Sequence, residues 1–291
     1  MKLLRYSHNI ALIVAFLVIG CQSKQSISES KPLDPIELKK ILSEVRIKQM
    51  QEDVKNKIPY QGSLLHQARC DTLIALGYNV AENFEEKSTP YTKNGDYHLA
   101  FSYLEQAYKI DPKGTLNYYS WVMLYYFRDY ERALKLLTEH EKNSNSPHAN
   151  AWGENVNYLK GLALKQMGRN EEAITEFTKY INNHGTYVDP YTYLYRGIAY
   201  LNLDNYELAL KDIELLLSKD QKSSAAYYWK AEVLAKKRKY AEALNNLRIS
   251  LDHVKRGNIR TDAYMELFDM PMITQVEDKI EEIEKLILDT K

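Results

Sequence analysis

Histidines, cysteines and paired carboxylates, the side chains that most often carry out enzyme chemistry, are scattered along this chain of 291 residues. None of the seven histidines belongs to an HExxH zinc pair, and the sequence lacks a CxxC pair, a Gly-Lys-Thr phosphate loop and a GxSxG elbow. The carboxylates Glu171 and Glu172 fall at an expected helix start, where the helix dipole favours negative charge. We therefore predict that the protein is not an enzyme and has no catalytic residues, no metal site and no cofactor.

The two cysteines differ in setting. Cys70 lies in line with the apolar residues Leu73 and Phe84, which predicts a buried core thiol, and no motif places a histidine beside it. Cys21 instead follows an unbroken apolar run, Ile10 to Ile19, which is shorter than the roughly 20 residues that span a bilayer. Because basic residues precede this run, we predict that residues 1–20 are an export signal peptide.

The residues Val18-Ile19-Gly20-Cys21 are similar to a bacterial lipobox. The resemblance implies that Cys21 is acylated, with palmitate among its lipids, and becomes the new N-terminus of a lipoprotein. Gln22 follows it in place of Asp, which by resemblance to known sorting rules favours the outer membrane. We therefore expect a lipid-anchored protein of the bacterial cell envelope. The alternatives are an ordinary signal peptide with a chance cysteine, or an uncleaved anchor.

The charge balance of the expected mature chain restricts the classes of partner that it can bind. Cleavage removes Lys2 and Arg5 from the 39 basic residues and leaves the 39 acidic ones, so the mature chain has a net charge near −2. This balance provides no electrostatic footprint for nucleic acid or for an anionic lipid surface. Residues 22–33 are small and polar, so we expect Cys21 and a flexible tether to occupy residues 21–34.

One pattern of large and small residues occurs twice between residues 189 and 252, with the copies 34 positions apart. Its residues are Tyr193, Gly197, Tyr200, Tyr206, Ala209, Ile213 and Leu217, then Tyr227, Ala231, Leu234, Tyr240, Ala243, Leu247 and Leu251. Apolar residues recur at three- and four-residue spacing within each half, so each copy predicts two short helices. The small residues, such as Gly197, are expected where the two helices approach most closely. Because so small a pair buries too little surface to stand alone, it requires neighbours on both sides.

Further copies precede these two. Taking Ala100, Ala133, Ala173, Ala209 and Ala243 as markers gives spacings of 33, 40, 36 and 34. This arrangement resembles the tetratricopeptide repeat (TPR) family over residues 63–256. The resemblance implies an all-α, right-handed superhelical solenoid of antiparallel helix pairs, with about five repeats, an extra N-terminal helix and a C-terminal capping helix.

The elements that flank and interrupt the repeats are less regular. Residues 35–62 are predicted to hold an N-terminal helix, and residues 257–291 capping helices with an apolar stripe from Ile273 to Ile287. Because Pro90 would break a helix over residues 81–94, we predict a long helix from about Ser63 to Phe84 and a loop near residues 88–94. Residues 141–147 are expected to be irregular, and His148 to Met167 to form one extended helix.

The sequence contains 24 tyrosines, many of them on the expected first helices of the repeats. In TPR arrays these helices line a concave groove, and transfer of the groove positions gives a set of ligand-binding candidates. They are Tyr119, Met123, Tyr126, Tyr158, Leu162, Lys165, Tyr191, Leu194, Ile198, Tyr228, Glu232 and Lys236. Tyrosine can bury an apolar strip while its hydroxyl binds a peptide or a sugar. The alternative is that tyrosine merely packs where other arrays have leucine.

One TPR subfamily clamps a C-terminal dicarboxylate with Lys and Asn at the fifth and ninth repeat positions. Here those positions hold Tyr158 and Leu162, Leu194 and Ile198, and Tyr228 and Glu232. A ligand held by its carboxylates is therefore not expected.

The leading hypothesis is a lipid-anchored, non-catalytic scaffold that binds a protein or peptide segment in the concave groove. A glycan- or cell-wall-binding lipoprotein that uses the aromatic groove residues is the second hypothesis. An enzyme with a site of dispersed residues is the third, and a deep pocket with convergent carboxylates or histidines would favour it.

Overall fold

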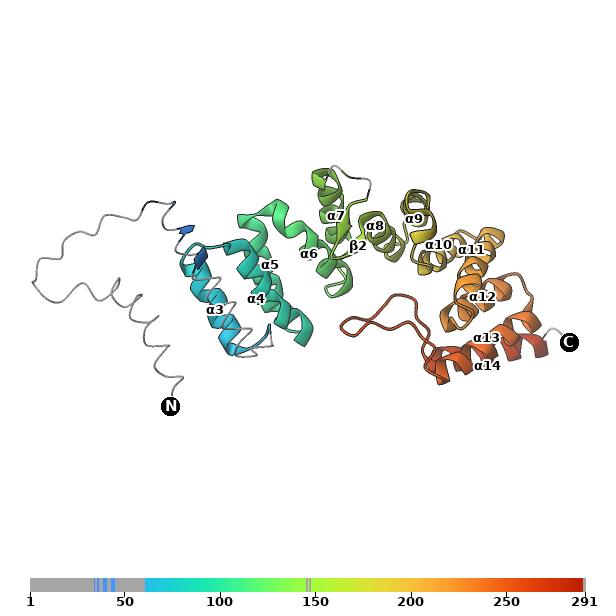
Figure 1. Cartoon of the computed structure of the whole chain (residues 1–291). Helices are drawn as coiled ribbons and strands as arrows, with labels where there is room; N and C mark the ends of the chain where they lie inside the picture. Colours follow the sequence, from blue (N-terminus) through green and yellow to red (C-terminus); the bar gives the residue numbers. More distant parts are fainter. Residues whose placement is uncertain are drawn as a thin grey trace, which may run out of the picture. The chain divides into compact units, whose positions relative to one another are not determined.

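The computed structural model describes residues 61–144, 146 and 148–289, with a few isolated positions between Asp34 and Glu44. The chain divides into Met1–Lys57 and Ile58–Lys291, and the second unit is described here (Figure 1). The export signal, Cys21, the tether and most of the expected N-terminal helix lie outside the described residues. Within the described residues, no helix is both long and apolar enough to cross a membrane.

The described chain is built almost entirely from α-helices, as predicted. They are α3 (Leu64–Ala75), α4 (Val80–Asn94), α5 (Tyr97–Ile110), α6 (Pro112–Tyr125), α7 (Tyr130–Ser144), α8 (Val156–Gln166), α9 (Asn170–His184), α10 (Tyr191–Asn202), α11 (Tyr206–Lys219), α12 (Ser224–Lys236), α13 (Tyr240–Lys255) and α14 (Ile273–Asp289). A short hairpin, β1 (Asn150–Ala151) and β2 (Glu154–Asn155), and a 3-10 turn, η1 (Gly185–Tyr187), interrupt them.

Five successive helix pairs make up the repeats: α4/α5, α6/α7, α8/α9, α10/α11 and α12/α13, and each helix also packs against the next along the chain. The alanines used as markers, Ala100, Ala133, Ala173, Ala209 and Ala243, are all fully buried. Gly197 also lies at a close approach, because a Cβ there would be 3.1 Å from Ile213 Cγ1. The all-α solenoid of helix pairs predicted from the sequence is confirmed.

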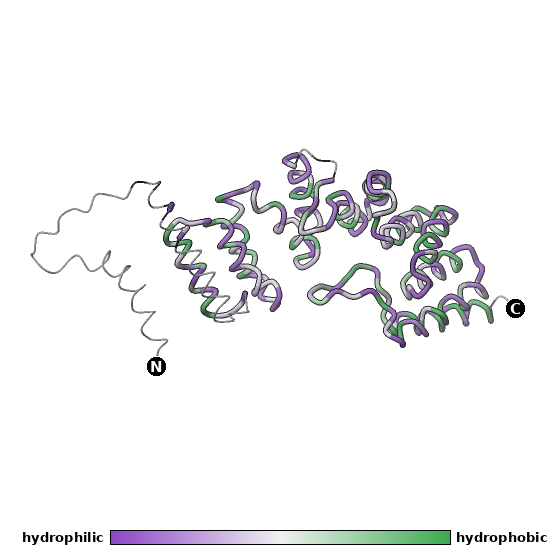
Figure 2. The backbone as a smooth tube through the Cα atoms, in the orientation of Figure 1, coloured by the Kyte–Doolittle hydropathy of each residue, from purple (hydrophilic) through white to green (hydrophobic). Residues whose placement is uncertain are grey.

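The core is arranged as two clusters. The larger one extends from α5 to α12, and the smaller one joins α12, α13 and α14. Figure 2 shows hydrophobic and hydrophilic positions alternating along these helices, as expected when each helix buries one side. Val276 and Ile283 of α14 are fully buried in the smaller cluster, so α14 covers the apolar side of the last repeat.

The predicted loop over residues 88–94 is wrong, because α4 continues through Pro90. The predicted long helix from Ser63 to Phe84 is also wrong, since the chain turns between α3 and α4 at Gly77 and Asn79, both with positive φ. A proline inside a helix costs about 3 kcal/mol. Packing of α4 against α3, α5 and α6 outweighs this local cost.

The predicted extended helix over His148–Met167 is wrong as well, since α8 begins only at Val156. The preceding hairpin turns through Trp152 and Gly153, with φ of +49° and +87°. A two-residue hairpin turn of this kind favours glycine or asparagine, so tryptophan is strained there. Contacts to α6 compensate, because the Trp152 backbone N–H donates to Asn117 Oδ1 at 2.6 Å and its ring contacts Tyr118.

Candidate functional site

The residues predicted to line a groove lie mostly between helices. Eight are buried: Tyr119, Met123, Tyr158, Leu162, Lys165, Tyr191, Leu194 and Ile198. Tyr126, Tyr228 and Glu232 are half-buried, and Lys236 is exposed. The burial has local causes: Tyr119 Oη donates to the Glu105 carboxylate on α5, and the Tyr158 ring packs between Phe177 and Tyr195.

The first helices α6, α8, α10 and α12 contact one another in sequence, and we call the side that they form the first-helix face. Residues 256–272, between α13 and α14, have no helix or strand. Figure 1 shows this segment running back from α13 and α14 toward α6 and α8. We call it the strap. Its side chains and main chain contact α6, α8, α10 and α12.

The strap is anchored by Phe268, which is only 5% exposed. Its ring stacks on Tyr125 of α6, with centroids 5.5 Å apart and planes at 25°, and meets the ring of Tyr130 edge-on at 6.1 Å. The Arg128 guanidinium carbon lies 4.3 Å from the Phe268 ring centroid, within cation–π distance. This is an aromatic pocket with a cationic wall.

The next residue, Asp269, is held through both its side chain and its main chain. Lys165 Nζ of α8 lies 2.6 Å from Asp269 Oδ2, and the Lys165 side chain is only 4% exposed. Trp229 Nε1 of α12 donates to the Asp269 carbonyl at 2.9 Å, and Tyr195 Oη of α10 donates to the Phe268 carbonyl at 3.4 Å. The sequence disfavoured a ligand held by carboxylates. Lys165, which lies outside the clamp positions, nevertheless pairs with a carboxylate of this chain, that of Asp269.

Arg260 fixes the other end of the strap. Its guanidinium donates to both carboxylate oxygens of Asp189, at 2.6 and 3.1 Å, and lies 4.4 Å from the Tyr191 ring centroid. Although burial opposes the charged form, the neighbouring Tyr158 and Asp189 raise the pKa of Arg260. Asp189 also accepts from the Tyr191 backbone N–H at the start of α10, at 2.9 Å. Of the predicted groove residues, Lys165 and Tyr191 therefore contact the strap directly.

The aromatic pocket is supported from the hairpin by Glu154. Its carboxylate accepts from Trp121 Nε1 at 2.8 Å and from Tyr125 Oη at 3.1 Å. Burial raises the pKa of Glu154, against these two hydrogen bonds. Glu154 thus orients Tyr125, on which Phe268 stacks. Sequence reasoning missed this residue because it assigned the hairpin to a helix.

Predicted groove residues in the last repeat face the capping helix. Glu232 Oε1 lies 3.2 Å from Lys279 Nζ of α14. Tyr228 packs against the smaller core cluster, and burial is the main cause that raises its pKa. The contacts of these two side chains therefore tie α12 to α14.

A histidine does lie beside the buried thiol, contrary to the sequence analysis. His66 Nδ1 is 3.9 Å from Cys70 Sγ, and His66 Nε2 is 3.5 Å from Glu86 Oε2. The Cys70 sulfur and then Glu86 raise the pKa of His66 to about 9. The four-residue spacing of His66 and Cys70 on one helix was the available signal. Cys70 is fully buried, so its sulfur is not accessible to a substrate in this structure.

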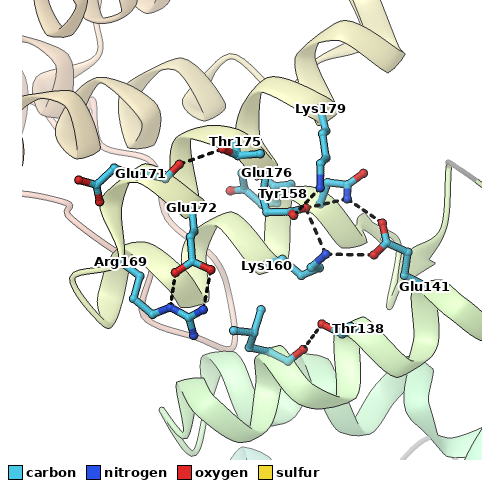
Figure 3. Close-up of polar contacts among 12 residues, drawn as sticks. Thr138, Glu141, Tyr158, Lys160, Arg169, Glu171, Glu172, Thr175, Glu176 and Lys179 are labelled. Atoms are coloured by element: carbon cyan, nitrogen blue, oxygen red, sulfur yellow. Dashed lines mark hydrogen bonds and ion pairs between the residues drawn. The ribbon is translucent and has the colours of Figure 1, made fainter.

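A second polar cluster joins the repeats away from the strap. Lys160 Nζ lies 3.0 Å from Glu141 Oε2 and 3.2 Å from Glu176 Oε2, and Lys179 Nζ lies 2.7 Å from Glu176 Oε1 (Figure 3). Although burial opposes it, Lys160 lowers the pKa of Glu141. These groups satisfy one another and link α7, α8 and α9. Within residues 61–144, 146 and 148–289, no group of three or more His, Cys, Asp or Glu side chains is placed to hold a metal ion.

Comparison with known proteins identifies the repeats. Tetratricopeptide repeat profiles match residues 158–224, 194–247 and 88–113. A search of curated proteins finds no match. Among solved structures, "MamA 41-end from Desulfovibrio magneticus RS-1" is similar with 15% identity and a TM-score of 0.52, over 60% of this chain and 96% of that one.

A tetratricopeptide repeat protein from Parabacteroides merdae ATCC 43184 is similar with 18% identity and a TM-score of 0.50, over 60% of this chain and 67% of that one. The "MamA RS-1 ArsTM double mutant" has 15% identity and a TM-score of 0.50, over 61% of this chain and 96% of that one. At these identities the similarity concerns the fold alone.

Proposed function

This chain is a tetratricopeptide repeat protein, and from that premise we propose that it is a non-catalytic scaffold whose first-helix face binds an extended segment of a partner protein. Solenoids of this kind present long surfaces along which an extended chain can lie. One observation carries the proposal: the face already holds an irregular peptide, the strap, through a ring, a carboxylate and two main-chain carbonyls.

The contacts to the strap are of the kinds that recognise peptides. Rigid aromatic side chains with polar ends, such as Tyr195 and Trp229, bury apolar surface while their O–H or N–H groups bind a main-chain carbonyl. A buried anchor in such a pocket is worth on the order of 2 kcal/mol. Several anchors along one face suit a partner that presents a linear segment.

We propose that the scaffold is anchored to a membrane by lipid on Cys21, and that residues 22–33 tether it there. The apolar run before Cys21 and the polar residues after it support this proposal. The expected location is the outer membrane. Cys21→Ala should release the protein into the soluble fraction, and continued retention of this variant in membranes would refute the anchor.

Co-purification tests the scaffold function. The full chain is isolated from membranes of its own cells after mild crosslinking, alongside Tyr126→Ala on the first-helix face and Lys211→Ala, an exposed change on α11. A partner captured by the wild type and the Lys211 variant, and lost with the Tyr126 variant, is the expected result. A partner that depends on Lys211 and is indifferent to Tyr126 would overturn the proposed face.

Trp152 supports a second candidate function, binding of a glycan. Its ring is 50% exposed at the tip of the hairpin, and it lies beside Tyr118 and Trp121, with ring centroids 4.6 and 6.2 Å away. Exposed tryptophan with a hydrogen-bonding edge is suited to a sugar ring. A glycan array with the full chain and with Trp152→Ala separates the candidates, since only glycan binding should be lost in this variant.

A further inference from the structure

We propose that the strap is an intramolecular competitor for the partner, and that the partner's docking segment has the same chemistry: an acidic, extended peptide in which phenylalanine is followed by aspartate. The inference rests on the proposed scaffold function and adds to it the nature of the partner and the regulation of the face.

The strap is longer than the connection between α13 and α14 requires. Lys255 Nζ lies 2.9 Å from Glu277 Oε1, and Arg248 Nη2 lies 3.1 Å from Glu284 Oε1, so α13 and α14 run antiparallel and side by side. A short turn suffices for such a connection: the single residue Asp111 joins α5 to α6. The 17 residues 256–272 therefore exceed what the connection requires. Irregular loops of this length within a compact array are uncommon and usually functional.

The docked part of the strap and the face beneath it carry complementary charges. Arg128 and Lys165 supply positive charge where the strap docks, and residues 262–272 of the strap carry three carboxylates, Asp262, Glu266 and Asp269, and no basic side chain. Arg128 Nη2 donates to the Glu266 carbonyl at 2.9 Å and lies 3.7 Å from Glu266 Oε2. An acidic peptide thus fits this part of the face.

The strap buries few apolar side chains. Residues 261–264 are exposed, as is Glu266, and the largest buried apolar side chain of the segment is Phe268. The strap adds no strand or helix to the array. Segments with few buried apolar contacts open locally at a smaller free energy than the whole fold. The strap can therefore leave the face while the repeats stay folded.

Competition from a tethered segment has a calculable size. A flexible tether holds its segment at an effective concentration on the order of 1 mM. If the free segment binds the face with a Kd of about 10 μM, an identical peptide in solution binds the intact chain about 100-fold more weakly than a chain whose strap is released. To overcome this loss of apparent affinity, a natural partner must bind the face more tightly than the strap peptide does or make further contacts.

The test uses a fluorescent peptide of residues 262–272 and the full chain. Wild type is compared with Phe268→Ala/Asp269→Ala, which removes the strap side chains that contact Tyr125 of α6 and Lys165 of α8 while the face stays intact. Fluorescence anisotropy should show at least tenfold tighter binding to the double variant. Adding Trp229→Phe, which removes the N–H donor to the strap carbonyl and keeps a ring, should weaken the gain. Circular dichroism verifies that each variant is folded.

Two matched peptides define the chemistry. A peptide with alanine at the positions of Phe268 and Asp269 should lose binding, whereas a slightly longer 258–272 peptide with alanine at the position of Thr261 only should retain it. Equal affinity of the wild type and the double variant would overturn the competition. Binding that ignores the Phe and Asp positions would overturn the assigned chemistry.

The outcomes separate this inference from the scaffold function itself. A partner captured through Tyr126 with equal yield by the wild type and by the double variant leaves the scaffold proposal standing and refutes the competition. A wild-type dimer that grows with concentration and disappears in the double variant, seen by light scattering, would mean that the strap docks on a second copy, and it refutes the inference of a foreign peptide.

Discussion

Asp269→Ala tests how the strap is held, because it removes the carboxylate that faces Lys165 at 2.6 Å. Removing one partner of a buried ion pair costs about 3 to 5 kcal/mol when the other charge must stay buried. The Lys165 side chain is only 4% exposed, so the full cost would apply if the strap remained in place. The strap can instead leave the face, which lets water reach Lys165 and avoids the cost of a buried, unpaired charge.

The strap leaves the face once the cost of burying an unpaired Lys165 exceeds the free energy of docking. The loss of stability therefore cannot exceed the free energy of docking. Burial of Phe268 contributes about 1.5 to 3 kcal/mol, and the hydrogen bonds from Tyr195 and Trp229 about 1 kcal/mol each, before the entropy of ordering the strap is subtracted. We therefore expect Asp269→Ala to open the strap and to lower global stability by less than about 3 kcal/mol.

Hydrogen exchange measured by mass spectrometry, with urea unfolding in parallel, checks this expectation. Amides in residues 257–272 should exchange at least tenfold faster in Asp269→Ala, and those of α9 and α11 should be unchanged. Asp278→Ala on α14 is the matched control, because Asp278 is exposed and lies outside the strap. A loss of 3 to 5 kcal/mol in global unfolding, with exchange raised throughout the array, would refute the idea that the strap is separable.

Three further predictions concern the scaffold. Gly161→Ala should destabilise the protein by about 1 to 3 kcal/mol in urea unfolding, because its Cβ would lie 2.5 Å from Phe177 Cε1. The same change in a Phe177→Ala background should stabilise, and an additive double-mutant cycle would contradict the contact. Burial raises the pKa of Glu85 from 4.5 to about 8, so the folded chain keeps a proton that the unfolded chain releases. Stability should therefore fall as pH rises from about 4.5 to 8, and Glu85→Gln should flatten this slope in thermal melts, whereas equal slopes would count against it. In a Cys21→Ser protein, iodoacetamide should alkylate the fully buried Cys70 only as fast as α3 opens, and labelling at the rate of a free thiol would show that the site is accessible.

The repeat scaffold could be predicted because its determinants are local and recur. Ala100 and Ala243 mark equivalent positions in different repeats, and both are fully buried as the pattern requires. A small residue at the helix crossing is a consequence of helix geometry that one sequence reveals. The pairs α10/α11 and α12/α13 and the cap by α14 follow from such short-range spacing, whereas the position of α4 in the first pair did not.

The failures of prediction share a physical cause. At Pro90, packing against three neighbouring helices overrides a local cost, and no local pattern reports that packing. Trp152 likewise occupies a turn that its own preferences disfavour, because contacts to α6 compensate. Propensity is a weak guide wherever tertiary contacts are strong.

Only part of the candidate site could be predicted from the sequence. Transfer from the family placed Lys165 and Tyr191 on the face that the strap contacts, and the ligand role of all twelve groove residues stays a prediction. Phe268 could not be found, because its contacts to Tyr125 join residues far apart in the chain and the strap has no periodic pattern. The identity of the anchors depends on the path of an irregular segment, which spacing does not encode.

Photo-crosslinking tests the central claim, that the first-helix face receives the partner, most directly. A photo-reactive amino acid is placed at Tyr126, which is half-buried directly after α6 and beside Trp121, or at the exposed Lys211 on α11, in the full chain within its own cells. The account predicts a crosslinked partner from position 126, with a higher yield after Phe268→Ala/Asp269→Ala, and none from position 211. A partner crosslinked from position 211 and absent from position 126 would contradict it.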